Sequence, residues 1–302
     1  MSRFLFCCLA CLFCCKKNPQ TDLSNYSNTV FSTAFAAGLR TGIIQGNFVK
    51  ELSGIAASRL NIGGYWVHSD GAIKEIYLID SLGNHLATLP LSAATPTIDC
   101  EDIATGWLDG QAYIFLADIG DNNGQNDTHR IYRIPEPMMP NVPRPVALPV
   151  PTDMRVLTFG YPGGIRFNAE SLLFDPMSKD ILVVTKDATA TVFVLQEADW
   201  AGAGTVTAQR VAELPISKAT AGDISSDGLE VLLKNKQEIF YWKLPRDSSV
   251  RAVLGENLPE RTLYSPETQG EAICFNIGNI GFLTSTERAN ANEQPIFSYK
   301  RK

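Results

Sequence analysis

The sequence predicts an all-β protein, a five-bladed β-propeller whose ring is closed by an N-terminal strand. The first observation is a short motif, one acid followed by small or apolar residues, that occurs five times at intervals of roughly 50 residues, as in a repeat architecture. The second is that short alternating segments separated by turn residues follow each motif, enough for about four strands per repeat. The third is that the last repeat lacks its fourth strand, while the segment from Phe35 to Ile44 has no local partner and can supply it.

The individual strands follow from these alternations. The first repeat predicts strands at Leu52–Ser58, Tyr65–His68, Glu75–Asp80 and His85–Leu91, and the second at Ile103–Trp107, Tyr113–Ala117, His129–Ile134 and Met154–Phe159. The third predicts Ser171–Phe174, Ile181–Thr185, Thr191–Gln196 and Thr207–Leu214, and the fourth Ile224–Ser225, Glu230–Leu233, Ile239–Leu244 and Arg261–Tyr264. The fifth predicts only Ala272–Phe275, Gly281–Ser285 and Ile296–Lys300.

A proline-rich stretch from Pro135 to Pro151 interrupts the second repeat. Because proline cannot donate to a β-ladder, this stretch is expected to be a surface excursion and not a central strand. The alternative is a six-bladed ring in which the stretch hides a degenerate blade. Helices are expected to be scarce, and Ala198–Trp200 is the only fragment that looks helical.

The N-terminus differs in composition from the rest of the chain. Residues 1–15 combine one arginine with a cysteine-crowded apolar run, residues 16–29 are polar, and residues 30–302 hold the propeller repeats. The stretch Leu12-Phe13-Cys14-Cys15-Lys16-Lys17 resembles a bacterial lipoprotein signal, with Cys15 as the expected lipidated residue and Cys11 as the second choice. The alternative is a metal-binding or palmitoylated cysteine cluster. The first interpretation predicts a lipid-anchored protein of the bacterial cell envelope, periplasmic or surface-exposed.

Charge and cysteine content limit the partners. A formal net charge of −6 argues against nucleic acid as the main partner, and a monomer is expected. Cys100 and Cys274 are the two cysteines outside the N-terminal segment, and both are expected to be free, buried thiols.

The five acids of the repeated motif are the first candidate site. In a propeller the innermost strands line a central channel, so acids at the start of these strands would form a ring at one mouth. The five acids are Glu51, Glu101, Glu170, Asp223 and Glu271. Such carboxylates repel one another unless they are compensated. A Ca²⁺ ion could bind their oxygens, or backbone N–H groups could hold them as purely structural links between blades. The shortage of histidine makes zinc unfavourable.

The loops after the second strand of each repeat should open on the same mouth. They carry polar residues that could surround a pocket for a phosphate or carboxylate ligand. The candidate rim residues are Ser69, Asp118, Asp121, Asn122 and Arg288, and the candidates for chemistry are Asp70, Lys186 and Glu287.

The repeated motifs also resemble a known family. Glu51-Leu-Ser-Gly-Ile, Asp99-Cys-Glu101, Asn168-Ala-Glu170-Ser-Leu, Gly222-Asp223-Ile-Ser and Gln269-Gly-Glu271-Ala-Ile are similar to motifs of the SdiA-regulated family of bacterial envelope proteins. This resemblance implies a calcium-associated propeller without a settled activity. A weaker likeness to calcium-activated nucleotidases and to phytase-like and esterase-like propellers implies Ca²⁺-dependent hydrolysis as an alternative.

Two functions follow as expectations. The first is a Ca²⁺-binding module that presents one face to a small-molecule or protein ligand. The second is a Ca²⁺-dependent phosphoesterase, with Glu287 or Asp70 as base and Lys186 holding negative charge. The chain lacks a Gly-Xaa-Ser-Xaa-Gly elbow and a His-Glu-Xaa-Xaa-His motif, and its three histidines are scattered, which favours the binding module.

Overall fold

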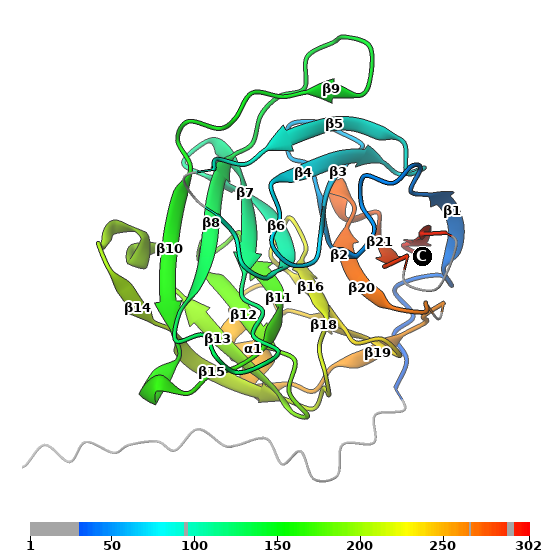
Figure 1. Cartoon of the computed structure of the whole chain (residues 1–302). Coiled ribbons are helices and arrows are strands. Elements are labelled where there is room, and N and C mark those ends of the chain that lie inside the picture. The colour runs from blue at the N-terminus through cyan, green and yellow to red at the C-terminus, as the bar shows by residue number, and fades with distance from the viewer. Residues whose placement is uncertain (1–29, 94–95, 266, 289–292) are drawn as a thin grey trace, which may run out of the picture.

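Five small β-sheets fan out from a common axis and form the blades of a propeller (Figure 1). The computed structural model describes residues 30–93, 96–265, 267–288 and 293–302. The prediction of an all-β five-bladed propeller is confirmed, and the six-bladed alternative is wrong because the proline-rich stretch forms no sheet of its own. The segments 1–15 and 16–29, with Cys11 and Cys15, lie outside the described residues.

Each blade runs from an inner to an outer strand. Blade 1 contains β2 (Leu52–Ala57), β3 (Gly64–Ser69), β4 (Glu75–Asp80), β5 (His85–Pro90) and the short β9 (Val146–Ala147). Blade 2 contains β6 (Cys100–Leu108), β7 (Gln111–Asp118), β8 (His129–Pro135), β10 (Arg155–Gly160) and the short β14 (Thr205–Thr207). Blade 3 contains β11 (Ala169–Phe174), β12 (Ile181–Thr185), β13 (Ala190–Leu195) and β15 (Gln209–Leu214). Blade 4 contains β16 (Ala221–Ile224), β17 (Glu230–Lys234), β18 (Ile239–Lys243) and β19 (Glu260–Thr262). Blade 5 contains β20 (Gly270–Phe275), β21 (Gly281–Thr286), β22 (Pro295–Lys300) and β1 (Leu39–Ile43).

The innermost strands β2, β6, β11, β16 and β20 surround the axis, each in contact with the next and β20 in contact with β2. Hydrogen bonds between neighbouring blades join the starts of these strands to one another and their ends to one another. Ser53 Oγ donates to the Glu101 carbonyl oxygen (2.7 Å) at the starts, and Thr105 Oγ1 donates to the Ala57 carbonyl oxygen (2.7 Å) at the ends. The channel therefore has one mouth at the starts of the inner strands and a second mouth at their ends.

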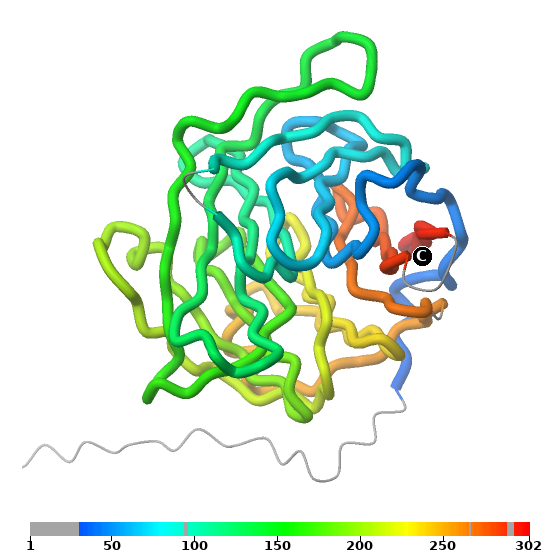
Figure 2. The backbone as a smooth tube through the Cα atoms, viewed as in Figure 1, coloured from blue at the N-terminus to red at the C-terminus, as the bar shows by residue number. Residues whose placement is uncertain are grey.

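The N-terminal segment closes the ring as predicted. β1 pairs antiparallel with β22, the last strand of the chain, and so completes blade 5. Figure 2 shows the blue N-terminal segment beside the red C-terminal one. Phe35 precedes β1 and pairs with Arg301 in an isolated bridge, and its fully buried ring packs edge-on against Tyr241 of blade 4 and Phe282 of blade 5. The N-terminal segment therefore pairs with the last strand of the described chain and packs against both blade 4 and blade 5.

Apolar packing between adjacent blades supplies the core. The inner strands β2, β11 and β20 are buried along their whole length, because each lies between two neighbouring blades and faces the channel. Phe115 of blade 2 and Phe174 of blade 3 stack at 4.8 Å with nearly parallel rings. Cys100 and Cys274 are free and buried in these layers, which confirms the prediction.

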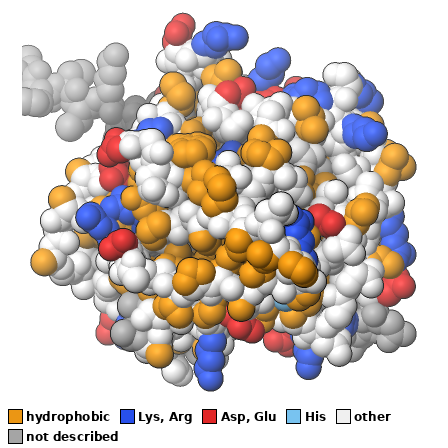
Figure 3. All heavy atoms as spheres, turned by 90° about the horizontal axis from the view of Figure 1, so that it is seen from above, with side chains coloured by type: hydrophobic (Ala, Val, Ile, Leu, Met, Phe, Trp, Pro, Cys, Tyr) orange, Lys and Arg blue, Asp and Glu red, His pale blue; other side chains and the backbone are white. Residues whose placement is uncertain are grey.

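The proline-rich excursion lies over the outer side of blade 1. Its only strand, β9, pairs parallel with β5 at the sheet edge, where proline is tolerated. At its start, the buried carboxylate of Glu136 accepts hydrogen bonds from Trp66 Nε1 (2.9 Å) and the Arg59 backbone N–H (3.0 Å). Figure 3 views this side of the molecule and shows hydrophobic side chains gathered there. The excursion is thus anchored to blade 1 by a buried acid.

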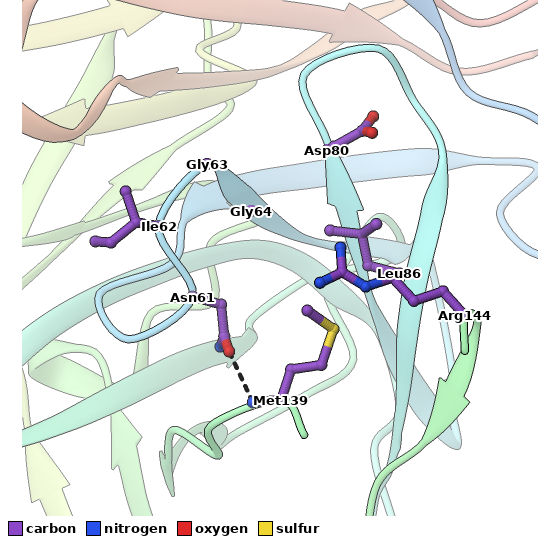
Figure 4. A pocket seen from close by; sticks show the side chains of 8 residues that line it. All are labelled: Asn61, Ile62, Gly63, Gly64, Asp80, Leu86, Met139 and Arg144. Atoms are coloured by element: carbon purple, nitrogen blue, oxygen red, sulfur yellow. Dashed lines mark hydrogen bonds between the residues drawn. The ribbon is translucent and has the colours of Figure 1, made fainter. Parts of the chain in front are cut away.

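A cavity of about 340 Å³ lies between the excursion and the β2–β3 connection (Figure 4). Asn61 Oδ1 accepts a hydrogen bond from the Met139 backbone N–H (2.7 Å) at one side, and Arg144 and Asp80 line the rest. The hydrogen bond between Asn61 and Met139 at this cavity is a further contact that holds the excursion against blade 1.

Helices are few, and the described residues contain one α-helix and three short 3₁₀ elements, two of them at Pro162–Gly164 and Ile277–Asn279. Glu197–Ala201 is a 3₁₀-helix, in agreement with the helical fragment expected at Ala198–Trp200. The α-helix α1 (Val250–Glu256) was not predicted, although Ser249 caps it and three apolar side chains lie on its buried face. In the parts of the chain that the structure describes, no helix has the length and apolarity needed to cross a bilayer.

Candidate functional site

Local irregularities in three inner strands place acids at the first mouth of the channel. The pairing register of β6, β11 and β20 shifts at one residue near the start of each strand, and these residues are Glu101, Glu170 and Glu271. A β-bulge inserts one extra residue and re-aims its side chain. All three carboxylates are buried, with 3–6% of each residue exposed.

The other two acids of the motif occupy different positions. In β2 the register shift falls at Ser53, so Glu51 lies before the strand and is exposed. β16 has no such shift, and Asp223 accepts hydrogen bonds from the backbone N–H groups of Ile224 and Phe275 (both 2.8 Å). Five equivalent acids were expected at the mouth, but only three of them occupy the bulge position. Asp223 instead links the inner strands of blades 4 and 5.

Three carboxylates gather at the mouth beside blades 1 and 2. One oxygen each from Asp70, Asp99 and Glu101 lies within 4.8 Å of the other two. Burial raises the pKa of Asp70 to about 6, and repulsion from Asp99 adds to this effect. Burial likewise raises the pKa of Glu101 to about 10, with repulsion from Glu170 and Asp70. Ionising all three acids at once is therefore unfavourable in this partly buried position.

The residues around this cluster shape it from β6 and β7. Asp118 Oδ1 accepts hydrogen bonds from the backbone N–H groups of Ile98 (2.9 Å) and Asp99 (2.7 Å), which fixes the segment that carries Asp99. Gly120 lies against the acids, since a Cβ atom there would be 2.3 Å from Asp99 Oδ2 and 2.4 Å from Glu101 Oε1. Asp70 Oδ1 is buried without a hydrogen-bond partner. Ser53 Oγ donates to Glu101 Oε2 at 3.4 Å, while one oxygen from each of the three acids faces the other two.

Lysines neutralise the acids on the opposite side of the mouth. Lys186 Nζ forms an ion pair with Glu170 and lies 3.9 Å from Glu271 Oε1, and Lys236 Nζ lies 2.9 Å from the same oxygen. Burial acts to lower the pKa of Lys186, but Glu170 outweighs it and the pKa is raised. These ion pairs compensate the negative charge of Glu170 and Glu271 in a way different from the two expected, a Ca²⁺ ion or backbone N–H groups. Lys186 also acts to lower the pKa of Asp99 and of Glu101, so the Asp70–Asp99–Glu101 side of the mouth is partly compensated.

A carboxyl pair borders the lysines. Burial and a hydrogen bond with Glu271 raise the pKa of Glu287 to about 8. Burial acts to raise the pKa of Glu271, but hydrogen bonds from Glu287 and Lys236 outweigh it and the pKa is lowered. The pair thus holds one proton near neutral pH, on Glu287.

The candidate rim residues divide into two groups. Asp118 and Asp121 are buried at this mouth, but Asp121 accepts from the backbone N–H groups of Gln125 and Asn126 and so shapes its own loop. The remaining three are Ser69 at the end of β3, whose carbonyl oxygen contacts His68 Nδ1 at 2.7 Å, Asn122, which accepts from Asn168 Nδ2 at 3.0 Å, and Arg288, which donates to the Gly46 carbonyl oxygen at 2.6 Å. These three contacts are structural.

Asp99 was not among the predicted site residues, and the buried ion pair in blade 4 was not predicted. Asp99 precedes the second motif acid by two residues, so the Asp-Cys-Glu spacing was a usable signal. Lys234, at the end of β17, has a fully buried side chain 3.5 Å from the equally buried Glu267. The sequence of β17 does not indicate that Lys234 is buried, because its partner Glu267 lies 33 residues further along the chain in another loop.

The fold and this site define a class: a five-bladed β-propeller with a mixed acid–lysine cluster at one channel mouth. Comparison of the chain with protein-family models and with curated proteins finds no match in either set. The function is therefore argued from the site.

A pH dependence follows from these carboxyls. The pKa values of Asp70, Glu101 and Glu287 in the folded state exceed the ordinary carboxyl value near 4, so the folded protein binds more protons than the unfolded chain. Their contribution to stability is fully present below about pH 4, the ordinary carboxyl value, and is lost as pH rises from there through the folded pKa values of about 6, 8 and 10. In EDTA, we expect the free energy of unfolding, measured with urea, to fall over this range. Glu101→Gln should flatten that fall, and an equally steep fall in the variant would contradict the assignment.

Proposed function

We propose that this propeller binds a divalent cation, Ca²⁺, at the Asp70–Asp99–Glu101 cluster and acts as a ligand- or partner-binding module. The observation that carries the proposal is the convergence of three carboxylates within 4.8 Å around a buried, unpartnered oxygen of Asp70. Burial, and then repulsion from neighbouring acids, raise the pKa of each of the three groups, and a cation in contact with their oxygens would offset both effects. Gly120 lets Asp99 and Glu101 lie against its backbone, because a Cβ atom there would clash with both carboxylates.

The donor set favours Ca²⁺ over other metals. All three side chains offer oxygen only, which suits a hard cation, and carbonyl oxygens and water can complete the six to eight ligands that Ca²⁺ takes. Zinc prefers nitrogen and sulfur ligands. His68, the histidine next to this mouth, is fully buried, and burial lowers its pKa to about 4. The proposed cation site is therefore the Asp70–Asp99–Glu101 cluster and not a ring of all five motif acids.

The envelope location and the family remain part of the same proposal. The lipoprotein-like stretch ending at Cys15 supports a lipid-anchored protein of the bacterial cell envelope, where Ca²⁺ is available at higher concentration than in cytosol. The five repeated motifs support a relation to the SdiA-regulated envelope propellers. In this proposal the anchored propeller presents its acid–lysine mouth to the ligand.

The test is a thermal melt of the chain from Asn18 onward, first in EDTA and then with added Ca²⁺ or Mg²⁺. At 100 times its Kd, Ca²⁺ should raise the free energy of unfolding by about 2.7 kcal/mol, because it binds only the folded state. Asp99→Asn and Glu101→Gln should each lose most of this increment. The matched control is Asp153→Asn, an exposed acid between the proline-rich excursion and β10, which should keep the full increment.

A second variant separates the three-acid cluster from the ring of five. Glu170 is paired with Lys186, so Glu170→Gln should leave the Ca²⁺ increment nearly unchanged. If Glu170→Gln loses the Ca²⁺-dependent increment in the free energy of unfolding, that result would support the ring of five acids over the three-acid cluster. Absence of any Ca²⁺-dependent rise in protein freed of metal would overturn the cation proposal.

One observation favours a hydrolase as the second candidate. Glu287, protonated near neutral pH, lies in a hydrogen-bonded pair beside Lys236, and Lys186 is close by. A proton donor and two ammonium groups next to a bound Ca²⁺ are groups that phosphate-ester hydrolysis uses. Asp70 belongs to the cation cluster in this arrangement, which leaves Glu287 and Lys186 as the catalytic candidates. Phosphate release that requires Ca²⁺ and is lost in Glu287→Gln would establish hydrolysis over binding alone.

A further inference from the structure

The second mouth of the channel, at the ends of the inner strands, holds a cavity of about 370 Å³. All five blades contribute to its wall, through the last residues of their inner strands or the connections that follow them. The residues that decide its chemistry are Arg59, Trp107, Phe174, Met177 and Lys179. This is the volume range in which proteins bind small molecules, and a channel mouth is a concave position where blades converge.

The wall is apolar and in part exposed. Trp107 is 44% exposed and Met177 is 72% exposed, although both are large apolar residues. The ring of Phe174 also lines the cavity and is held in place by stacking on the ring of Phe115. Gly106 permits this position, since a Cβ atom there would be 2.1 Å from the Phe174 ring. The cavity therefore offers a preformed apolar surface, which lowers the entropic cost of binding.

Two cations border the apolar surface. Arg59 Nη2 donates to the Thr105 carbonyl oxygen (3.0 Å), while its Nε is buried without a partner, so part of its donor capacity is unused. Lys179 lies on the wall contributed by blade 3, and Asp227 is the acid among the lining residues. Asp223 of β16 accepts from two backbone N–H groups, and the charge of Arg59 also acts to lower its pKa, so Asp223 partly balances Arg59. Two cations and one acid line the cavity wall, in a protein of net charge −6.

We propose that this cavity binds a small amphiphilic anion, with an aromatic or branched apolar body against Trp107, Phe174 and Met177 and a carboxylate facing Arg59 and Lys179. Arginine recognises carboxylates through parallel N–H donors, and such charge-assisted bonds are stronger than neutral ones. The acidic mouth at the other end of the channel would repel the same ligand. The site is thus separate from the proposed cation site and does not depend on it.

The test uses two probes that share one ring system, 1-naphthaleneacetate and its neutral analogue 1-naphthaleneacetamide. Isothermal titration calorimetry should give a Kd for the anion that is lower by about tenfold or more, the ratio expected for one charge-assisted pair. Arg59→Met should remove most of this preference, and Lys179→Met should reduce it. Ser226→Trp, a change at an exposed turn on the cavity rim, should weaken both probes by filling the space.

The control is Lys74→Met, an exposed lysine on the connection between β3 and β4, which removes one positive charge away from the cavity and should leave both affinities unchanged. Ser226→Trp and Lys179→Met keep the test decisive if Arg59→Met fails to fold. Equal affinity for the two probes, no heat of binding at millimolar concentration, or full binding in Ser226→Trp would each overturn the proposal.

Discussion

Replacing Glu267 with alanine is expected to lower the free energy of unfolding by about 3–5 kcal/mol. Lys234 and Glu267 form an ion pair whose two side chains have no exposed surface, and Tyr264 OH donates to the same carboxylate at 2.8 Å. Removal of the acid would leave the lysine in the interior with the Gly270 carbonyl oxygen and the Tyr264 ring as its partners. Urea unfolding at neutral pH measures the loss.

The matched control is a solvent-exposed pair, Arg210–Glu213, with side chains 53% and 40% exposed. Glu213→Ala should cost no more than about 1 kcal/mol, because water already screens these charges. Burial lowers the pKa of Lys234, so the loss in Glu267→Ala should shrink at alkaline pH, where the lysine gives up its proton. A loss for Glu267→Ala as small as that for Glu213→Ala would show that the buried pair does not stabilise blade 4.

The second large effect concerns the closure of the ring. Phe35→Ala should cost about 3–5 kcal/mol, because it removes a fully buried ring that contacts Tyr241 at 5.4 Å and Phe282 at 4.9 Å between centroids. These partners lie in blades 4 and 5, so the cavity would open where the N-terminal segment joins the two. Denaturant unfolding followed by circular dichroism measures the change.

Phe31→Ala is the control within the same segment. Phe31 is 52% exposed, so its loss should change the free energy of unfolding by less than about 0.5 kcal/mol. Similar losses for the two variants would mean that the N-terminal segment closes the ring through its backbone pairing with β22 alone, without a contribution from the Phe35 ring.

The two channel mouths differ in chemistry because they are built from opposite ends of the same five strands. The starts carry the bulged acids and receive the loops after the second strands, which bring Asp70, Lys186 and Lys236. The ends carry apolar and cationic residues such as Trp107 and Arg59. One side chain cannot serve both mouths, so a cation and an organic anion can bind without competing. This separation makes each proposal testable without the other.

The sequence by itself determined the architecture of this protein. Alternation of apolar and polar residues has the same period as a strand, so it located nearly every strand within a few residues, and the missing last strand identified the N-terminal segment as the closing one. Turn spacing also placed Asp70, Lys186 and Glu287 on the acidic mouth. The helix α1 was missed because seven residues are too few to establish a helical period.

Only the tertiary structure decided which acids share a site. A register shift of one residue turns a side chain from one face of a strand to the other, and such shifts leave no mark in the sequence motif. They place Glu101, Glu170 and Glu271 at the mouth, while the unshifted β16 puts Asp223 between two backbone N–H groups. The partners that set each charge, such as Lys186 for Glu170, come from different loops or different blades, and proximity in space is not readable from one chain.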